Sequence, residues 1–321
     1  RPDVALDISY LPIRTTAYLH SRWASEFYVI MHSLAALINS SQSRKQQLFL
    51  LAEQARRRIP DWSYIADMYD FVKADYELNP DKENWELTRD RVAIRYQYEQ
   101  NAGYTYKYPW DSGINFAASM VSLFYGEGDY KKTIRIGSMS GWDSDNPTST
   151  WGGLLGLLYG HKGLQQYFKK TTFSENYNIS RTRHNFPQDI DNFSAMAERG
   201  LKIIDKIVIE EMNGTIDKDN WIIPLLKGQI SKDQVDETFV PWQIIEDSDQ
   251  SWTFEGFQTK ENQWNASGAS LTFGNKNCKA DISFEGTAVQ YYAFRSPKGG
   301  YVQVILDGKD YGKISLKDDS L

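Results

Sequence analysis

The chain has 321 residues, a net charge of −6 and a sequence pI near 5.4. This acidic balance argues against a nucleic-acid-binding protein, which usually presents a basic face. The length suits two domains, and the 41% apolar and 14% aromatic content is ample for hydrophobic cores. Because no run of about eighteen apolar residues occurs, we expect no membrane span.

The chain starts at Arg1 without an initiator Met or a signal peptide, which is typical of a processed or excised start. The single cysteine, Cys278, excludes an internal disulfide, and we expect either a buried thiol or a partner outside this chain. Five Asn-X-Ser/Thr sequons predict a secreted, extracellular glycoprotein. They lie at Asn39, Asn178, Asn192, Asn213 and Asn265.

The first part of the chain shows the periodicity of helices. Apolar side chains at helical spacing predict a helix over 22–38. Ser41 or Ser43 is expected to cap a second helix, which ends before Pro60, and Asp61 is expected to cap a third. Short breaks between such helices indicate an α-helical bundle. Further helices are predicted over 83–98, 112–125, 130–139 and 189–212.

The stretch 141–160, GWDSDNPTSTWGGLLGLLYG, places two carboxylates at the entrance to a predicted helix. Asp143 and Asp145 suit a hard divalent cation, since carboxylate oxygens are its preferred ligands. Asp is also a common helix cap, so the residues alone leave both interpretations open. The glycines of the following helix predict close packing against neighbours, because glycine is otherwise costly in a helix.

Beyond residue 212 the composition changes. Residues 213–240 have the glycine, proline and acidic content of a linker. From 241 onward apolar and polar residues alternate in short runs, one of them over 289–294, and Asp307-Gly308 is a strong hairpin signal. The pattern predicts an antiparallel β-sandwich over 241–321. Since the chain stops shortly after a predicted strand, we expect this sandwich to be partial.

Residues 114–160 read INFAASMVSLFYGEGDYKKTIRIGSMSGWDSDNPTSTWGGLLGLLYG. An Asn-containing helix, a G-E-G-D-Y turn with a second helix, and G-W-D-S-D-N leading into a Gly/Leu helix together resemble the C-terminal part of the ADP-ribosylglycohydrolase family. The upstream segment ARRRIPDWSYIADMYDFVKADYE is also similar to that family. The resemblance implies an all-α domain over 1–212 whose N-terminal part is missing here. The whole chain is then a multidomain α and β protein.

The resemblance also implies an activity and a site. Family members are metal-dependent hydrolases with a dinuclear Mg²⁺ or Mn²⁺ centre, which cleave a glycosidic bond to ADP-ribose or a related glycosyl group. Carried over residue by residue, Asp143 and Asp145 would be metal ligands. Asn146 stands where the family usually has Thr, and its amide oxygen can coordinate a hard cation. Asn115 and Trp142 would line the substrate site.

One half of the family's site has no counterpart in this sequence. Its first half is a T-D-D motif, whereas the only Asp-Asp pair here is Asp318-Asp319, at the opposite end. Two carboxylates cannot hold two divalent ions. We therefore expect either a companion chain that carries the N-terminal half of the domain and completes a two-ion centre, or an inactive site.

Two other functions stay open at this point. The first is a catalytically inactive binding or structural protein on the same fold, as with the lens crystallins that resemble the family. The second is a lectin-like role, because the β region resembles the galactose-binding-like sandwiches of secreted glycan-active enzymes. In each case we expect a small-molecule or glycan ligand and no nucleic acid.

Overall fold

The computed structural model describes residues 1–17, 20–37, 41–98, 110–178, 190–218, 220–225, 230–233, 245–261, 263, 270–286, 289 and 291–318. It divides into two compact units, Arg1–Trp242 and Gln243–Leu321. Within these ranges, no helix combines the length and the apolar character needed to cross a bilayer.

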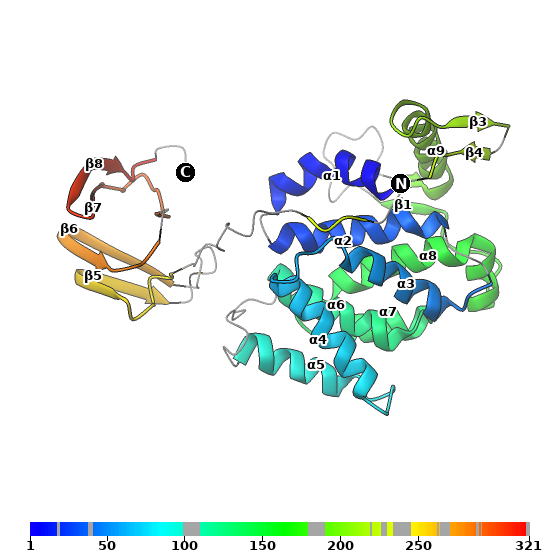
Figure 1. Cartoon of the computed structure of the whole chain (residues 1–321), viewed down its shortest axis with the longest axis horizontal. Coiled ribbons are helices and arrows are strands. Elements are labelled where there is room, and N and C mark those ends of the chain that lie inside the picture. Colours follow the sequence, from blue (N-terminus) through cyan, green and yellow to red (C-terminus); the bar gives the residue numbers. More distant parts are fainter. Residues whose placement is uncertain are drawn as a thin grey trace. The chain divides into compact units, whose positions relative to one another are not determined.

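The first unit is mainly helical (Figure 1). Its short strands form two antiparallel pairs, β1 (Asn176–Asn178) with β2 (Ile190–Asn192) and β3 (Thr215–Asp217) with β4 (Asn220–Ile222). The helices are α1 (Pro2–Thr16), α2 (His20–Leu34), η1 (Ala35–Leu37), α3 (Arg44–Arg56), α4 (Tyr64–Leu78), α5 (Glu86–Ala93), η2 (Ile94–Tyr98), α6 (Ser112–Gly126), α7 (Tyr130–Met139), α8 (Asp145–Phe168) and α9 (Phe193–Glu210).

Helix α6 runs through the middle of this bundle and contacts α2, α4, α5, α7 and α8. Every residue from Gly113 to Gly126 is buried. At Gly126 an added Cβ would lie 2.8 Å from the Thr133 Cα, so glycine is needed for the close turn into α7. The predicted helices over 112–125 and 130–139 are confirmed as α6 and α7.

The helix starts follow local capping chemistry. The Ser43 hydroxyl accepts from the Gln46 N–H while the Gln46 side chain accepts from the Ser43 N–H, so Ser43 caps α3 with a capping box. The prediction that Asp61 caps the next helix is wrong. The Ser63 hydroxyl caps α4 instead, accepting from the Ala66 N–H at 3.2 Å.

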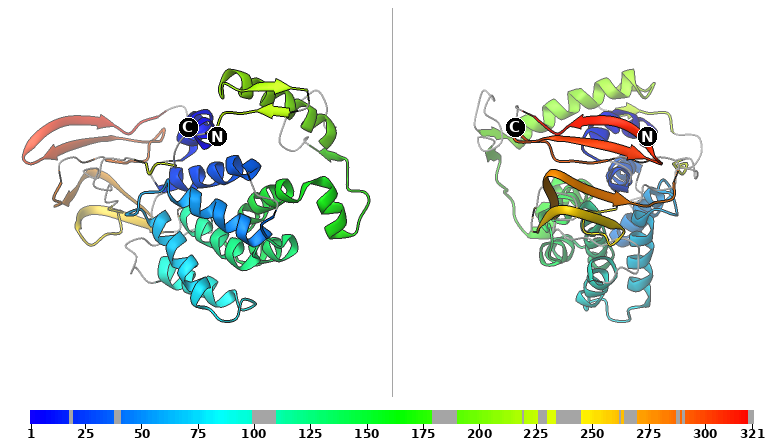
Figure 2. Two further views of the ribbon diagram at one scale, coloured as in Figure 1. Left: turned by 45° about the vertical axis from the view of Figure 1, so that its right-hand side comes forward. Right: turned by 90° about the vertical axis from the view of Figure 1, so that its left-hand side faces the viewer.

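The helix predicted over 189–212 begins later than expected. Residues 190–192 pair with β1 as strand β2, and the Asn192 side chain then caps α9 by accepting from the Ala195 N–H at 2.7 Å. Val208 is the one buried residue of α9. Figure 2 shows α9 and the β3–β4 hairpin together at the outside of the helical bundle.

The predicted close packing of the α8 glycines is not found at Gly153 and Gly156, whereas a Cβ on Gly152 would contact the Ile134 Cδ1 and the Tyr130 Oη at 3.5 Å. An added Cβ at Gly153 or Gly156 would meet nothing within 4 Å. The close approach comes from α7, where a Cβ on Gly137 would lie 3.2 Å from the Ser122 Oγ and 3.3 Å from the Thr148 Cγ2. This contact fixes the first turns of α8 against α6 and α7.

The second unit contains two antiparallel pairs. Strand β5 (Trp252–Glu261) pairs with β6 (Ser270–Ile282), and β7 (Tyr301–Leu306) pairs with β8 (Lys309–Ser315). Asp307 and Gly308 have φ values of 52° and 77°, so the predicted hairpin turn is confirmed. Cys278 on β6 is half-buried rather than buried, and its Sγ donates to the Gly256 carbonyl at 2.9 Å.

A β-sandwich is not seen among the described residues, where β5–β6 and β7–β8 form two separate two-stranded sheets. The strand predicted over 289–294 is absent from the described part of that range. The alternating pattern predicted strands in the regions of β5, β6, β7 and β8. Several apolar side chains of these strands are nevertheless exposed, such as Phe273 at 47% and Ile305 at 63%. The galactose-binding-like character of this region therefore stays a prediction.

Candidate metal centre

The turn between α7 and α8 has an unusual backbone. Gly141 has φ of 92° and Trp142 has φ of 52°. A bulky side chain in the left-handed region costs of order 1 kcal/mol, and such strain is often found at functional sites. The Trp142 indole Nε1 donates to the Gln97 Oε1 at 3.0 Å, which ties the strained residue to the end of η2.

Asn115 holds the turn from the side of α6. Its side chain is buried, with 3% of the residue exposed. The Asn115 Oδ1 accepts from the Asp143 N–H at 3.0 Å, and its Nδ2 donates to the Asp111 carbonyl at 2.9 Å. Asn115 therefore fixes the backbone of the first carboxylate of the pair.

The carboxyl groups of Asp143 and Asp145 lie together at the solvent-exposed start of α8. A hydrogen bond between the two side chains raises the pKa of Asp143, and partial desolvation and the negative charge of Asp145 act in the same direction. The N-cap residue Ser144 makes no side-chain capping hydrogen bond. The N-cap position of α8 is thus held by Ser144, and neither carboxylate occupies it.

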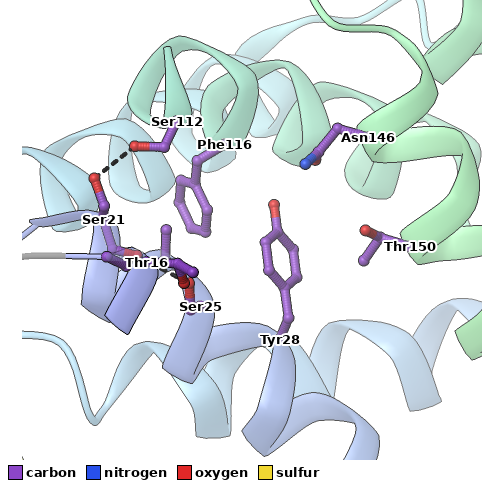
Figure 3. A pocket seen from close by; sticks show the side chains of 10 residues that line it. Thr16, Ser21, Ser25, Tyr28, Ser112, Phe116, Asn146 and Thr150 are labelled. Carbon is purple, nitrogen blue, oxygen red and sulfur yellow. Dashed lines mark hydrogen bonds between the residues drawn. The ribbon is translucent and has the colours of Figure 1, made fainter. Parts of the chain in front are cut away.

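A cavity of about 340 Å³ lies beside this first turn of α8. Asn146 and Thr150 face it from α8, and Tyr28 faces it from α2 (Figure 3). Asn115 and Trp142 are not among its walls. The lining residues are Thr16, Ala17, Ser21, Ala24, Ser25, Tyr28, Ser112, Phe116, Asn146 and Thr150.

Comparison with known proteins identifies the family of this chain. A family model described as ADP-ribosylglycohydrolase matches residues 1–198. The chain belongs to the ADP-ribosylglycohydrolase family. No curated protein and no solved structure gives a significant match. Family membership suggests a glycohydrolase, and the match does not extend to the strands of the second unit.

ADP-ribosylglycohydrolases are generally metal-dependent, so the fit of a divalent cation can be tested on this site. The contact with Asp145 raises the pKa of Asp143, because two carboxylates repel each other when both are charged. A cation bound between them would remove this repulsion. Mg²⁺ is commonly held by one or two carboxylates while it keeps several waters. Asp143 and Asp145 therefore fit one ion. The described residues offer no cluster of three or more His, Cys, Asp or Glu side chains, so a second ion would need ligands from elsewhere.

The sequence prediction missed the wall of the cavity formed by α2. Ser21, Ser25 and Tyr28 are spaced four and three residues apart, so they share one face of the helix. This row of polar groups at spacings of four and three residues was the available signal. It was overlooked because the periodic apolar residues of 22–38 explain the helix without it.

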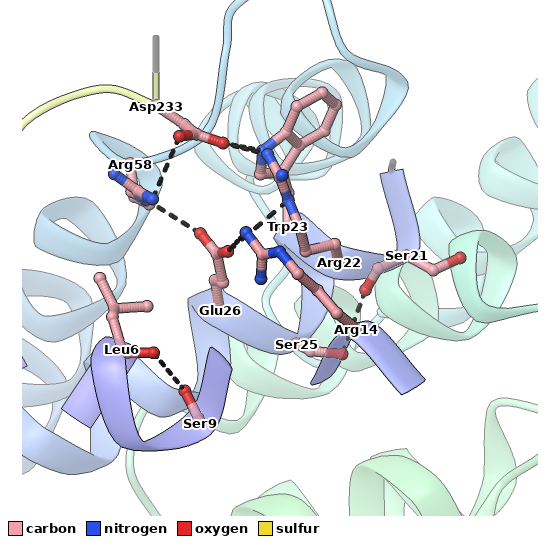
Figure 4. A network of polar contacts seen from close by, with 10 residues as sticks. All are labelled: Leu6, Ser9, Arg14, Ser21, Arg22, Trp23, Ser25, Glu26, Arg58 and Asp233. Carbon is pink, nitrogen blue, oxygen red and sulfur yellow. Dashed lines mark hydrogen bonds and ion pairs between the residues drawn. The ribbon is translucent and has the colours of Figure 1, made fainter. Parts of the chain in front are cut away.

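A cluster of paired charges is centred on Arg22 and Glu26 of α2 (Figure 4). Glu26 is 2% exposed, and Arg58 donates to its Oε2 at 2.9 Å, while Arg14 and Arg22 also pair with it. Asp233 accepts from the Trp23 indole at 3.0 Å and pairs with Arg22 and Arg58. With its charges mutually paired, this cluster is a structural anchor for residues 230–233.

The predicted glycosylation sites differ in position. Asn192 and Asn213 are exposed, at the two ends of α9, and Asn178 belongs to the backbone of β1. Asn39 and Asn265 lie outside the described residues.

Proposed function

We propose that this ADP-ribosylglycohydrolase family member is a metal-dependent hydrolase that cleaves a glycosidic bond to ADP-ribose or a related glycosyl group. The observation that carries the proposal is the pairing of Asp143 and Asp145 beside a ligand-sized cavity. The strained turn at Trp142 and the buried Asn115 hold the first of these carboxylates in place.

In this proposal Asp143 and Asp145 hold one Mg²⁺ or Mn²⁺, and the Asn146 amide lies next to them at the wall of the cavity. A bound cation of this kind orients sugar hydroxyls and activates water for attack at the anomeric carbon. The chain's own contribution is to converge two carboxylates on a fixed turn and to shape the adjoining cavity. Further ligands, including those of a second ion, would come from water or from a companion chain.

The test is the double variant Asp143→Ala/Asp145→Ala, assayed for Mn²⁺ binding by titration calorimetry and for hydrolysis of ADP-ribosylated substrates. We expect both to be lost, with at least a hundredfold drop in rate, and far-UV circular dichroism to be unchanged because exposed, mutually repelling carboxylates contribute little to stability. Asp7→Ala/Glu53→Ala removes the same charge from exposed positions on α1 and α3 and is the matched control. Full activity in the Asp143/Asp145 variant would place the site elsewhere.

A further inference from the structure

Asp233 is held by donors on both of its carboxylate oxygens. Its Oδ2 accepts from the Trp23 Nε1 at 3.0 Å and pairs with the Arg22 guanidinium. Its Oδ1 lies 3.1 Å from the Arg58 Nη2, and Figure 4 shows Asp233 between these side chains. Charge-assisted donors on both oxygens recognise an oxyanion by geometry as well as by charge. We call Arg22, Trp23 and Arg58 the oxyanion cradle.

The cradle does not depend on Asp233 for its shape. The buried Glu26, one turn after Arg22 on α2, accepts from the Arg58 Nε at 2.9 Å, and its Oε1 lies 3.6 Å from the Arg22 Nε. The Arg22 guanidinium also lies over the Trp23 ring, 5.1 Å from the ring centroid. Because these contacts come from the bundle itself, both guanidinium groups are expected to keep their positions when Asp233 leaves. Such preorganisation lowers the ordering cost of binding.

The cluster around the cradle carries more positive than negative charge. Three arginines surround two carboxylates: Arg14, Arg22 and Arg58 around Glu26 and Asp233. A net charge of +1 therefore remains with Asp233 in place, and +2 without it. A group with two negative charges, such as a phosphate, balances the arginines better than a single carboxylate does.

The segment that carries Asp233 is otherwise held by weaker contacts. Ile230 packs partly buried against the core, and the exposed Lys232 pairs with the exposed Asp61. The Asp233 N–H donates to the Arg58 carbonyl at 2.9 Å. Exposed ion pairs contribute little to stability, so attachment of the segment depends on the cradle. An anion that takes the place of the Asp233 carboxylate is therefore expected to displace residues 230–233.

We propose that the oxyanion cradle is a binding site for a phosphate group and that Asp233 fills it from the same chain as an exchangeable substitute. A phosphate group that competes with Asp233 releases residues 230–233 from the bundle, so ligand binding is coupled to the attachment of this segment. The proposal is independent of the proposed hydrolase function, because no residue of the cradle lines the cavity beside α8.

Isothermal titration calorimetry of the full chain with inorganic phosphate, without divalent cation and at constant ionic strength, tests this proposal. Asp233→Ala empties the cradle, and we expect at least tenfold tighter phosphate binding than in the wild type. The reason is that a site open about a tenth of the time binds with about tenfold weaker apparent affinity. Asp90→Ala removes an exposed carboxylate that pairs with Arg89 and is expected to bind as the wild type does. Tighter binding of glycerol 3-phosphate than of inorganic phosphate would identify a phosphate ester as the ligand, and the reverse order the free ion.

Thermal unfolding and a second variant locate the binding at the cradle. Asp233→Ala is expected to lower the Tm, and phosphate is expected to restore it more than chloride of equal ionic strength does, since a ligand of the folded state stabilises it. Arg58→Gln in the Asp233→Ala background leaves Glu26 paired with Arg14 and Arg22 and is expected to lose phosphate binding. Undetectable binding in Asp233→Ala, binding equal to that of the wild type, or binding that survives Arg58→Gln would overturn the proposal.

Discussion

The helical bundle and the C-terminal strands bury similar residues to very different degrees. Phe124 on α6 is 1% exposed and packs edge-to-face against Phe49 and Tyr69, whereas Phe273 on β6 is 47% exposed. Helix α6 has five neighbouring helices, but each described strand of the second unit pairs with a single other strand. Two-stranded sheets are marginal alone. Burial in this chain therefore depends on the number of packing partners rather than on apolar content.

The largest expected effect comes from a matched pair of truncations. Trp151 is fully buried and its indole donates to the Ser119 carbonyl at 3.0 Å, so Trp151→Ala is expected to lower the free energy of unfolding by about 3–5 kcal/mol. Phe273→Ala is expected to change it by about 0.5 kcal/mol. Urea unfolding followed by circular dichroism measures both. Equal losses would contradict the comparison between the two regions.

A change of pH is expected to act on the bundle through His20. His20, stacked on Tyr64 with ring centroids 3.6 Å apart, has its pKa lowered by burial from 6.5 to about 4. The contribution of neutral His20 to stability is present above pH 6.5, where the imidazole is uncharged in both the folded and the unfolded chain. It is lost as the pH falls towards 4, because the unfolded chain binds the proton first. We expect a loss on the order of 2 kcal/mol.

The measurement for His20 is the free energy of unfolding of the bundle at about pH 7 and about pH 4.5. His20→Phe keeps an aromatic ring beside Tyr64 and is expected to remove most of the difference. No histidine occurs after His184, so the strands are expected to lack this transition. A His20→Phe variant with the pH dependence of the wild type would show that other groups govern it.

The smallest effects contrast two glycines. Gly153 lies in α8 with open space around it, so Gly153→Ala is expected to stabilise the protein by about 0.5–1 kcal/mol. Gly308 has φ of 77° in the β7–β8 turn, so Gly308→Ala is expected to destabilise that hairpin by about 1 kcal/mol. Thermal unfolding of both variants checks the opposite signs. A destabilising Gly153→Ala would restore the view that α8 needs its glycines for packing.

Much of the bundle was predictable because its signals are local. Helix α7 spans the predicted residues, and the start of α3 at Ser43 follows from its capping box. Asp61 was predicted as the cap of α4 in place of Ser63 because both residue types cap helices well and both lie near the start of this helix. Strand β2 was missed because its pairing with β1 joins residues 12 to 16 positions apart, beyond the reach of a short hairpin signal. For the same reason strands could be predicted in the second unit, but their assembly could not.

The candidate site was predictable to a similar extent. The spacing of Asp143 and Asp145 makes them candidate ligands from the sequence alone, whereas the hydrogen bond by which Asn115 holds the turn was not predicted. Tyr28 could not be found in this way, because an aromatic residue at helical spacing is usually a core residue, and only the fold shows that it lines the cavity. Long-range geometry, rather than residue type, distinguishes such a tyrosine from its neighbours.

The anchoring of Asp233 has a consequence for the order of folding. Its carboxylate meets Arg22 across 211 residues of sequence, while most helix contacts in the bundle join near neighbours along the chain. Closing so long a loop costs entropy that only a preassembled binding surface can offset. We therefore expect residues 230–233 to attach after α2 and α3 have packed. The Asp233 N–H, which donates to the Arg58 carbonyl at 2.9 Å, is then expected to exchange with solvent through detachment of this segment, without unfolding of the bundle.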